Sequence, residues 1–241
     1  MQESLSNFMT VPPQRRAYLR ALLLVLGGGA LFGVILLSVT TKTGIAAWDQ
    51  PVHDWFVAQR SGSVTWLWET VTTVSSPTYL SVIGLVFAVI WAVVRREIWR
   101  PGLLMAAMAF TVAISYIIKH AVDRPRPSAA DFMMGPDDAF SFPSGHTLGA
   151  AVFILSLGYL LLSRHSTKAR RITVVAAAVV LIPAVAMSRL YLGYHWLSDV
   201  CASVALGIVL LGLVMAVDTW QPLQKWSNAA QRRKAAQAPA P

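Results

Sequence analysis

Charged residues are scarce in this chain. They make up 13% of its 241 residues, while 56% of the residues are apolar. An ordinary soluble domain carries about a quarter charged residues. This balance excludes an ordinary soluble enzyme and indicates a protein that lies in a lipid bilayer.

Cysteine and internal repeats are also lacking. Cys201 is the only cysteine, so the chain cannot form an intrachain disulfide or a cysteine metal cluster. Its place in a long apolar run predicts a role in helix packing. No internal repeat is evident, which disfavours transporters built from inverted repeats.

Six apolar runs are long enough to cross a hydrocarbon core of about 30 Å, which takes about 20 helical residues. They cover residues 17–40, 78–95, 102–121, 147–163, 172–189 and 198–217. The first run follows three arginines and resembles a signal peptide, but it is too long for a typical one and lacks a convincing cleavage site. The sequence therefore predicts an all-α integral membrane bundle of six transmembrane helices, residues 1–227, and a disordered cytoplasmic tail, residues 228–241.

The basic residues predict how the helices are oriented. If the N-terminus is cytoplasmic, the segments on its side of the membrane carry 14 of the 20 lysines and arginines. Cytoplasmic loops of membrane proteins are enriched in these residues, so both termini are expected in the cytoplasm and the chain in the plasma membrane. This topology explains the net charge of +9 better than nucleic-acid binding does, because the basic residues come in short clusters between apolar runs.

The longest segment expected outside the cell covers residues 41–77. Within it, Asp49, Gln50 and Pro51 are typical of the capped start of a short amphipathic helix, which we expect to lie on the outer surface. Charged residues interrupt every window that could make this segment a seventh span. His53 is expected to be a surface group.

Small residues in the first helix predict a close helix contact. Gly29 and Gly33 form a GxxxG pair, which lets another helix approach. Packing within the chain is the favoured interpretation, and a homodimer seam is the weaker alternative.

Basic residues and histidines gather in three connections that this topology brings to one side of the membrane. They are Lys119, Arg124 and Arg126 after the third run, Ser144, Gly145 and His146 before the fourth, and Arg189, His195 and Asp199 around the fifth connection. Ionisable groups at a membrane boundary are costly unless they are paired or functional. An excess of cations there predicts an anionic ligand.

Each of these parts suits phosphoryl transfer. Lys119 offers a point charge, and Arg126 and Arg189 offer planar forks that bind phosphate oxygens in pairs. Ser144 is the expected N-cap of the fourth helix, and Gly145 lets the backbone come close to an anion at the positive end of the helix dipole. The sequence therefore predicts that a phosphate is held from several sides.

Two histidines and a carboxylate can carry the chemistry. Asp199 follows His195 by four residues, so its carboxylate can accept the Nδ1 proton and leave Nε2 free to attack. His146, from another helix, can donate a proton to the departing oxygen and later activate water. The site offers too few hard oxygen ligands for Mg²⁺.

The complete pattern resembles the three-part signature of the type 2 phosphatidic acid phosphatase family, whose site is similar to that of the soluble vanadium haloperoxidases. The matching residues are Lys119 with Arg126-Pro127, Pro143-Ser144-Gly145-His146, and Ser188-Arg189 with His195 and Asp199. The resemblance implies a phosphohistidine mechanism without metal or cofactor. It implies that Lys119, Arg126, Ser144, Gly145 and Arg189 hold phosphate, that His146 is the acid, and that His195 and Asp199 are nucleophile and orienter. Arg124 lies outside the signature and is a candidate helper or lipid-headgroup contact.

The function expected from these residues is hydrolysis of the terminal phosphate of a lipid phosphate or diphosphate at the extracytoplasmic face. Undecaprenyl diphosphate, phosphatidylglycerophosphate and phosphatidic acid all fit, and the first two are favoured. A phosphotransferase that passes the phosphoryl group to a lipid or sugar hydroxyl would use the same site. A lipid or anion transporter is a third, less favoured, hypothesis.

Overall fold

The structure is a computed structural model that describes residues 13–137, 139–164 and 166–220. Six of its helices are long and apolar enough to cross a membrane: α2 (Pro13–Thr41), α5 (Pro77–Arg95), α6 (Trp99–Val122), α7 (Gly145–Leu162), α8 (Lys168–Tyr191) and α9 (Leu197–Trp220). The described part of the chain contains no β-strand. The predicted all-α bundle of six spans is confirmed, and every predicted span matches one of these helices to within four residues at either end. The predicted tail, residues 228–241, lies outside the described residues.

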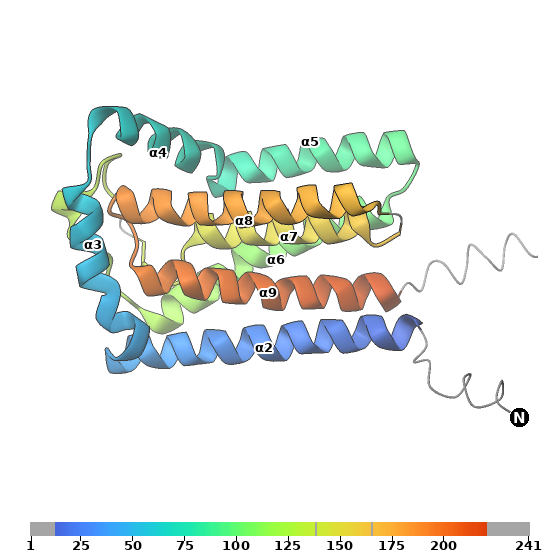
Figure 1. The fold of residues 1–241 in the computed structure, drawn as a ribbon, viewed down its shortest axis with the longest axis horizontal. Coiled ribbons are helices and arrows are strands. Elements are labelled where there is room, and N and C mark those ends of the chain that lie inside the picture. Colours follow the sequence, from blue (N-terminus) through green and yellow to red (C-terminus); the bar gives the residue numbers. More distant parts are fainter. Residues whose placement is uncertain (1–12, 138, 165, 221–241) are drawn as a thin grey trace, which may run out of the picture.

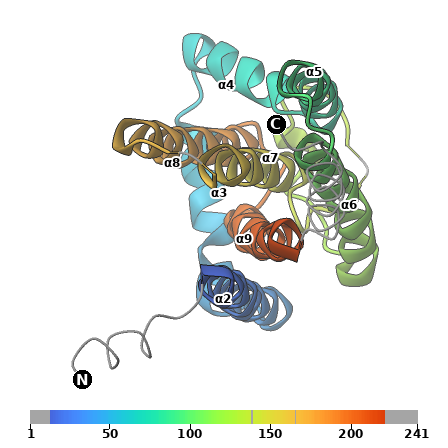
Figure 2. The same ribbon diagram turned by 90° about the vertical axis from the view of Figure 1, so that its right-hand side faces the viewer.

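Helices α7 and α9 lie inside the bundle, and the other spans surround them (Figure 2). In their most apolar stretches, α7 and α9 are 44% and 50% buried, whereas α2, α5 and α8 are each 17% buried. The large apolar side chains that α2, α5 and α8 leave exposed are mostly leucine, valine and isoleucine. A surface of this kind is stable when it faces lipid, so these helices form the lipid-facing wall of a multi-pass membrane protein.

Helices α2 and α9 approach each other closely at two glycines. A Cβ atom on Gly28 would lie 2.9 Å from a backbone carbonyl oxygen of α9, and one on Gly212 would lie 2.8 Å from a carbonyl oxygen of α2. A Cβ atom on Gly29 or Gly33 would meet nothing within 4 Å. The expectation that Gly29 and Gly33 pack against another helix of this chain is therefore wrong, because the contacting face of α2 contains Gly28 instead. A homodimer seam stays a prediction.

The segment between α2 and α5 lies at one end of the bundle, where α3 runs across the ends of other helices (Figure 1). It contains η1 (Gly44–Trp48), α3 (Asp49–Ala58) and α4 (Gly62–Val74). The prediction of one short helix in this segment is therefore wrong. Asp49 does not cap α3: Trp48 holds that position, and the Asp49 side chain is buried. His53 is also buried, with Nε2 3.1 Å from Asp131 Oδ2, so its predicted surface position is wrong. Buried polar groups need such partners.

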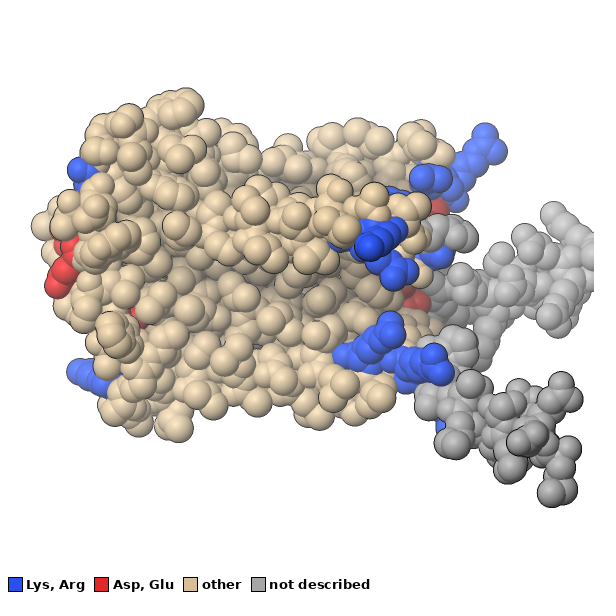
Figure 3. All heavy atoms as spheres, viewed as in Figure 1, with Lys and Arg blue, Asp and Glu red and all other residues tan. Residues whose placement is uncertain are grey.

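The opposite end of the bundle is basic. Lys and Arg side chains gather there, near the described ends of the chain (Figure 3). Arginines and lysines of the first turns of α2 and α8 and of the connection between α5 and α6 make up this end. The two described chain ends lie at this end of the bundle (Figure 1), as expected for termini on the same side of a membrane.

Candidate active site

Three segments meet at the end of the bundle that carries α3: the end of α6 with the loop after it, the start of α7, and the connection between α8 and α9. Helix α7 begins at Gly145, and its N-cap is Ser144, whose Oγ accepts a hydrogen bond from the Thr147 backbone N–H at 3.5 Å. The N-cap predicted for this helix is confirmed. The free N–H groups of the first turn of α7 consequently point toward this end of the bundle.

His195 lies two residues before the start of α9, and its ring is only 2% exposed. Its Nδ1 is 3.3 Å from Asp199 Oδ2, an oxygen that also accepts the Trp196 backbone N–H at 2.9 Å. Its Nε2 is 3.3 Å from Nη1 of Arg126. A guanidinium only donates hydrogen bonds, so Nε2 accepts and the imidazole proton belongs on Nδ1, facing the carboxylate. The lone pair on Nε2 is the one a nucleophile uses.

The pKa of His195 lies well below its usual value. The main cause is burial, because a charged imidazolium loses its hydration in the protein interior. The positive charges of Arg126, Arg189 and Lys119 lower the pKa further, and a hydrogen bond with the Ser141 backbone opposes them. A lowered pKa favours the neutral ring. His195 is therefore a neutral imidazole at neutral pH, with its one proton on Nδ1.

Arg126 makes contacts on both sides of its guanidinium. Its Nη1 donates to the Tyr194 carbonyl oxygen at 2.8 Å, and its Nε donates to the Ala139 carbonyl oxygen at 2.6 Å. Its Nη2 is 2.7 Å from Asp137 Oδ2. Asp137 belongs to the loop between α6 and α7, in which the sequence shows no recognisable ligand-selecting pattern. An anion that binds Arg126 therefore competes with this carboxylate for the same N–H groups.

Lys119 and Arg189 complete the cluster of cations. Lys119 Nζ donates to the carbonyl oxygen of Phe140, in the same loop. Arg189 is buried, donates from Nη1 to Thr72 Oγ1 at 2.7 Å, and lies over the Tyr194 ring with 4.5 Å between its Cζ atom and the ring centroid. Thr72 belongs to α4. The segment between α2 and α5 thus reaches into the site, which the sequence did not predict.

His146 is the second residue of α7 and is half-buried. It interacts electrostatically with Arg189, His195, Arg126 and Lys119. The two histidines of the sequence pattern are 49 positions apart along the chain. They therefore lie near one cluster of cations, His146 on α7 and His195 in the connection between α8 and α9.

Arg124 contacts the oxygen of the Asp199 carboxylate that does not face His195. Its Nη1 donates to Asp199 Oδ1 at 2.6 Å and to Ser198 Oγ at 2.7 Å, and its Nη2 donates to Asp49 Oδ2 at 2.5 Å. Asp49 in turn accepts the Ser198 backbone N–H at 2.8 Å. Arg124 therefore contacts the carboxylate that faces His195, and this geometry favours the helper interpretation over a lipid-headgroup contact.

A groove of about 210 Å³ runs between α5, α6 and α7 and ends at Lys119 and Gly145. Its other lining residues are mostly apolar or hydroxylic: Pro77, Leu80, Ser81, Met108, Thr111, Val112, Ser115, Tyr116 and Gly149. An apolar chain can lie along such a surface while a charged group reaches the cations at its end. Within the part of the chain that the structure describes, no group of three or more His, Cys, Asp and Glu side chains is placed to hold a metal ion.

Comparisons with known proteins agree with this architecture. A sequence profile described as the PAP2 superfamily matches residues 100–222. Phosphatidylglycerophosphatase B of Bacillus subtilis is 30% identical over 125 residues, which are 51% of this chain and 60% of that relative. Decaprenylphosphoryl-5-phosphoribose phosphatase of Mycobacterium tuberculosis is 33% identical over 136 residues, 55% of this chain and 70% of that relative. The crystal structure of a transmembrane PAP2 type phosphatidylglycerolphosphate phosphatase from Bacillus subtilis has a similar fold, with a TM-score of 0.75 and 21% identity, over 83% of this chain and 98% of that one.

Proposed function

Because this chain belongs to the PAP2 superfamily, we propose that it is an integral membrane enzyme that hydrolyses the terminal phosphate of a lipid phosphate or diphosphate. The observation that carries the proposal is the buried His195, paired with Asp199 through Nδ1 and facing Arg126 through Nε2. A neutral imidazole held in this tautomer inside a cluster of cations suits attack on a phosphate.

In the proposed reaction, the phosphate oxygens bind Lys119, Arg126, Arg189 and the free N–H groups of Ser144, Gly145 and the first turn of α7. Binding displaces Asp137 from Arg126 and lets the guanidinium turn from Nε2 to the phosphate. The cations are held in place by contacts such as Arg189 to Thr72. Once the phosphate is bound, they therefore offset the charge on the transferring phosphoryl group without further reorganisation.

The chemistry then takes two steps. Nε2 of His195 attacks phosphorus, the bond from phosphorus to the leaving oxygen breaks, and His146 donates a proton to that oxygen. The Asp199 carboxylate stabilises the positive charge that forms on the ring. Water then attacks the phosphohistidine, His146 takes a proton from the water, and the products are phosphate and free His195.

A lipid substrate is supported by the groove that ends at Lys119 and Gly145. The groove lets the chain of a lipid stay among apolar side chains while its phosphate meets the cations. The relatives' names point to phosphatidylglycerophosphate and to a polyprenyl-linked phosphate. We therefore add a decaprenyl-linked sugar phosphate to the three lipids that fit the sequence.

The test of this proposal is phosphate release by the purified full chain in detergent, measured as kcat/KM for each of these lipids. We expect release from at least one of them in the presence of EDTA, because the proposed site uses cations and histidines and no Mg²⁺. Vanadate, which resembles the transferring phosphoryl group, should inhibit. Loss of activity on chelation that Mg²⁺ restores would disprove metal independence. Transfer to an added alcohol without free phosphate would identify a phosphotransferase.

We also propose that the chain lies in the plasma membrane with the candidate site at the extracytoplasmic face, since the opposite end of the bundle is basic. In a Cys201→Ala background, an impermeant thiol reagent should label Ala130→Cys in intact cells and leave Ser166→Cys unlabelled. Ala130 is exposed in η2 (Ala129–Asp131), and Ser166 lies between α7 and α8.

The control for this labelling is the same pair of variants in opened membranes, where both positions should react. Labelling of position 166 alone in intact cells would mean that the orientation is the reverse.

A further inference from the structure

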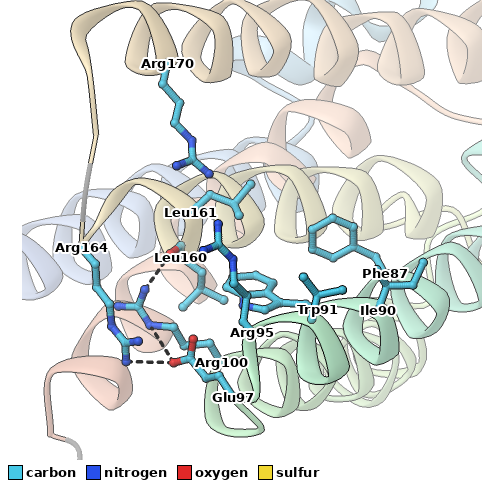
Figure 4. Close-up of a pocket in the computed structure, with 11 residues that line it drawn as sticks. Phe87, Ile90, Trp91, Arg95, Glu97, Arg100, Leu160, Leu161, Arg164 and Arg170 are labelled. Atoms are coloured by element: carbon cyan, nitrogen blue, oxygen red, sulfur yellow. Dashed lines mark hydrogen bonds and ion pairs between the residues drawn. The ribbon is translucent and has the colours of Figure 1, made fainter.

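A second hollow, of about 570 Å³, lies at the basic end of the bundle, away from the candidate active site (Figure 4). Side chains of α5, α7, α8 and the connection between α5 and α6 line it. None of its lining residues belongs to the three segments that form the candidate site. The hollow therefore needs an explanation that the proposed reaction does not supply.

The lining changes in character along the membrane normal. Phe87, Ile90 and Trp91 lie before the last turn of α5, whereas Arg95 ends that helix, and Arg164 and Arg170 lie beyond α7 and at the start of α8. Among these residues, the apolar side chains are thus nearer the middle of the bundle and the guanidinium groups nearer its end, while Leu160 and Leu161 add apolar surface close to the end of α7. A phospholipid has the same order, with chains inside and phosphate at the surface.

Two of the four arginines that line the hollow are already engaged with acids. Arg100 is buried and pairs with Asp218 through Nη2 at 2.9 Å. Arg164 pairs with Glu97 at 2.8 Å. Arg100 also donates to the Leu160 carbonyl oxygen at 2.8 Å, which fixes the guanidinium at the wall of the hollow.

Arg95 and Arg170 differ from these two. Among the ion pairs of the described residues, none involves Arg95 or Arg170. Their side chains come from α5 and α8 and extend toward the same part of the hollow from opposite sides (Figure 4). Two guanidinium groups that face each other repel, and an anion between them removes this repulsion while it accepts hydrogen bonds from both.

We propose that this hollow binds an anionic phospholipid of the leaflet at the basic end of the bundle. Its phosphate lies between Arg95 and Arg170, and one acyl chain lies along Ile90 and Trp91. The exposed face of α5, where Ile90 is 56% exposed, continues the apolar lining to the lipid-facing wall. Such a lipid connects α5 to α8, two helices on opposite sides of α7 (Figure 2). The proposal does not depend on the chemistry at the other end of the molecule.

The test measures lipid binding to the delipidated full chain in detergent, by native mass spectrometry and by the change in unfolding temperature. Dioleoylphosphatidylglycerol should bind and stabilise, and dioleoylphosphatidylcholine should do so much less. Arg95→Gln combined with Arg170→Gln should weaken phosphatidylglycerol binding by about tenfold or more, because two charge-assisted contacts are lost. Arg170→Gln alone should weaken it less. Arg100 is left unchanged because of its buried ion pair with Asp218.

The matched control is Arg15→Gln combined with Arg16→Gln, which removes the same charge from exposed positions of α2 at the same end of the bundle. This variant should bind phosphatidylglycerol as the unchanged chain does. Equal loss in both double variants would mean that diffuse charge attracts the lipid, and it would overturn the proposal. Full competition by inorganic phosphate or glycerol 3-phosphate would also overturn it, since the hollow would then be a site for a free anion. Unfolding temperatures of both delipidated double variants that equal that of the unchanged chain would show that the loss is not one of folding.

Discussion

Replacing His195 with alanine is expected to abolish turnover and protein-bound phosphate together, with a loss of kcat of about 10⁴- to 10⁶-fold. The ring is buried, its Nδ1 faces Asp199, and its Nε2 faces the guanidinium of Arg126. Among the described residues of the candidate site, no other group combines a free lone pair with an orienting carboxylate. Rapid-quench detection of acid-labile phosphate on the protein is the measurement that checks this.

His146→Ala is the matched variant, because it removes the second histidine of the same cluster. Hydrolysis of a lipid phosphate should fall by about 10²- to 10⁴-fold, since its alkoxide leaving group needs a proton. An aryl phosphate with a good leaving group needs little protonation. With such a substrate, this variant should show a burst of leaving group and should accumulate phosphohistidine, because attack by water is also slowed.

The two variants together decide which histidine is the nucleophile. Phosphohistidine on the His195→Ala protein, or label found only on His146, would reverse the two assignments while leaving the family membership untouched. A normal burst in both variants would mean that neither histidine forms the intermediate.

Asp199→Asn is expected to have the second largest effect, with phosphoenzyme formed about 10²- to 10⁴-fold more slowly. The amide has the shape of the carboxylate, but only one of its two ends, the oxygen or the NH₂ group, can occupy the place that faces both Nδ1 and the Trp196 N–H. It carries no charge to stabilise the imidazolium, and its NH₂ group can donate to Nδ1. Donation of this kind moves the ring proton to Nε2, where it blocks the lone pair that attacks phosphorus.

Asp49→Asn is the control for Asp199→Asn, because both carboxylates pair with Arg124 and only Asp199 contacts the histidine. Weakening the Asp49 pair should lower the unfolding temperature, since breaking a buried ion pair costs about 3–5 kcal/mol. The rate of phosphoenzyme formation by the folded protein should stay within about tenfold of normal. Equal rates of phosphoenzyme formation for Asp199→Asn and the unchanged chain would rule out an orienting role of Asp199. Equal slowing in both variants would mean that the effect comes from the ion pairs of Arg124 and not from the contact of Asp199 with His195.

Local signals in the sequence were enough to predict the six spans and the residues of the cluster. The length of an apolar run indicates a membrane span without reference to the rest of the chain, because each span must match the thickness of a bilayer. The spacing of His195 and Asp199 within one turn brings the imidazole to the carboxylate without any other part of the fold. Ser144 caps α7 for a similarly local reason, since a hydroxyl before a helix satisfies one of its free N–H groups.

The partners of these residues could not be predicted in the same way. These partners come from irregular or short helical segments. Thr72 and Asp49 reach Arg189 and Arg124 across long stretches of the chain, and Asp137 reaches Arg126 within one irregular loop. Periodicity predicts which face of an element is apolar. It does not predict which distant cation a single polar side chain will meet.

Two further features depended on how the helices pack. Gly28 contacts α9, whereas Gly29 and Gly33 face open space, because a rotation of α2 by one residue changes which glycine faces its neighbour. The basic clusters of the sequence predicted the orientation of the bundle, but only packing put Arg95 of α5 and Arg170 of α8 on the same hollow. The sequence by itself therefore determined the spans and which residues belong to the candidate site, since hydropathy and residue spacing are local properties. Tertiary structure decided which charges face each other, since those distances depend on the positions of several helices at once.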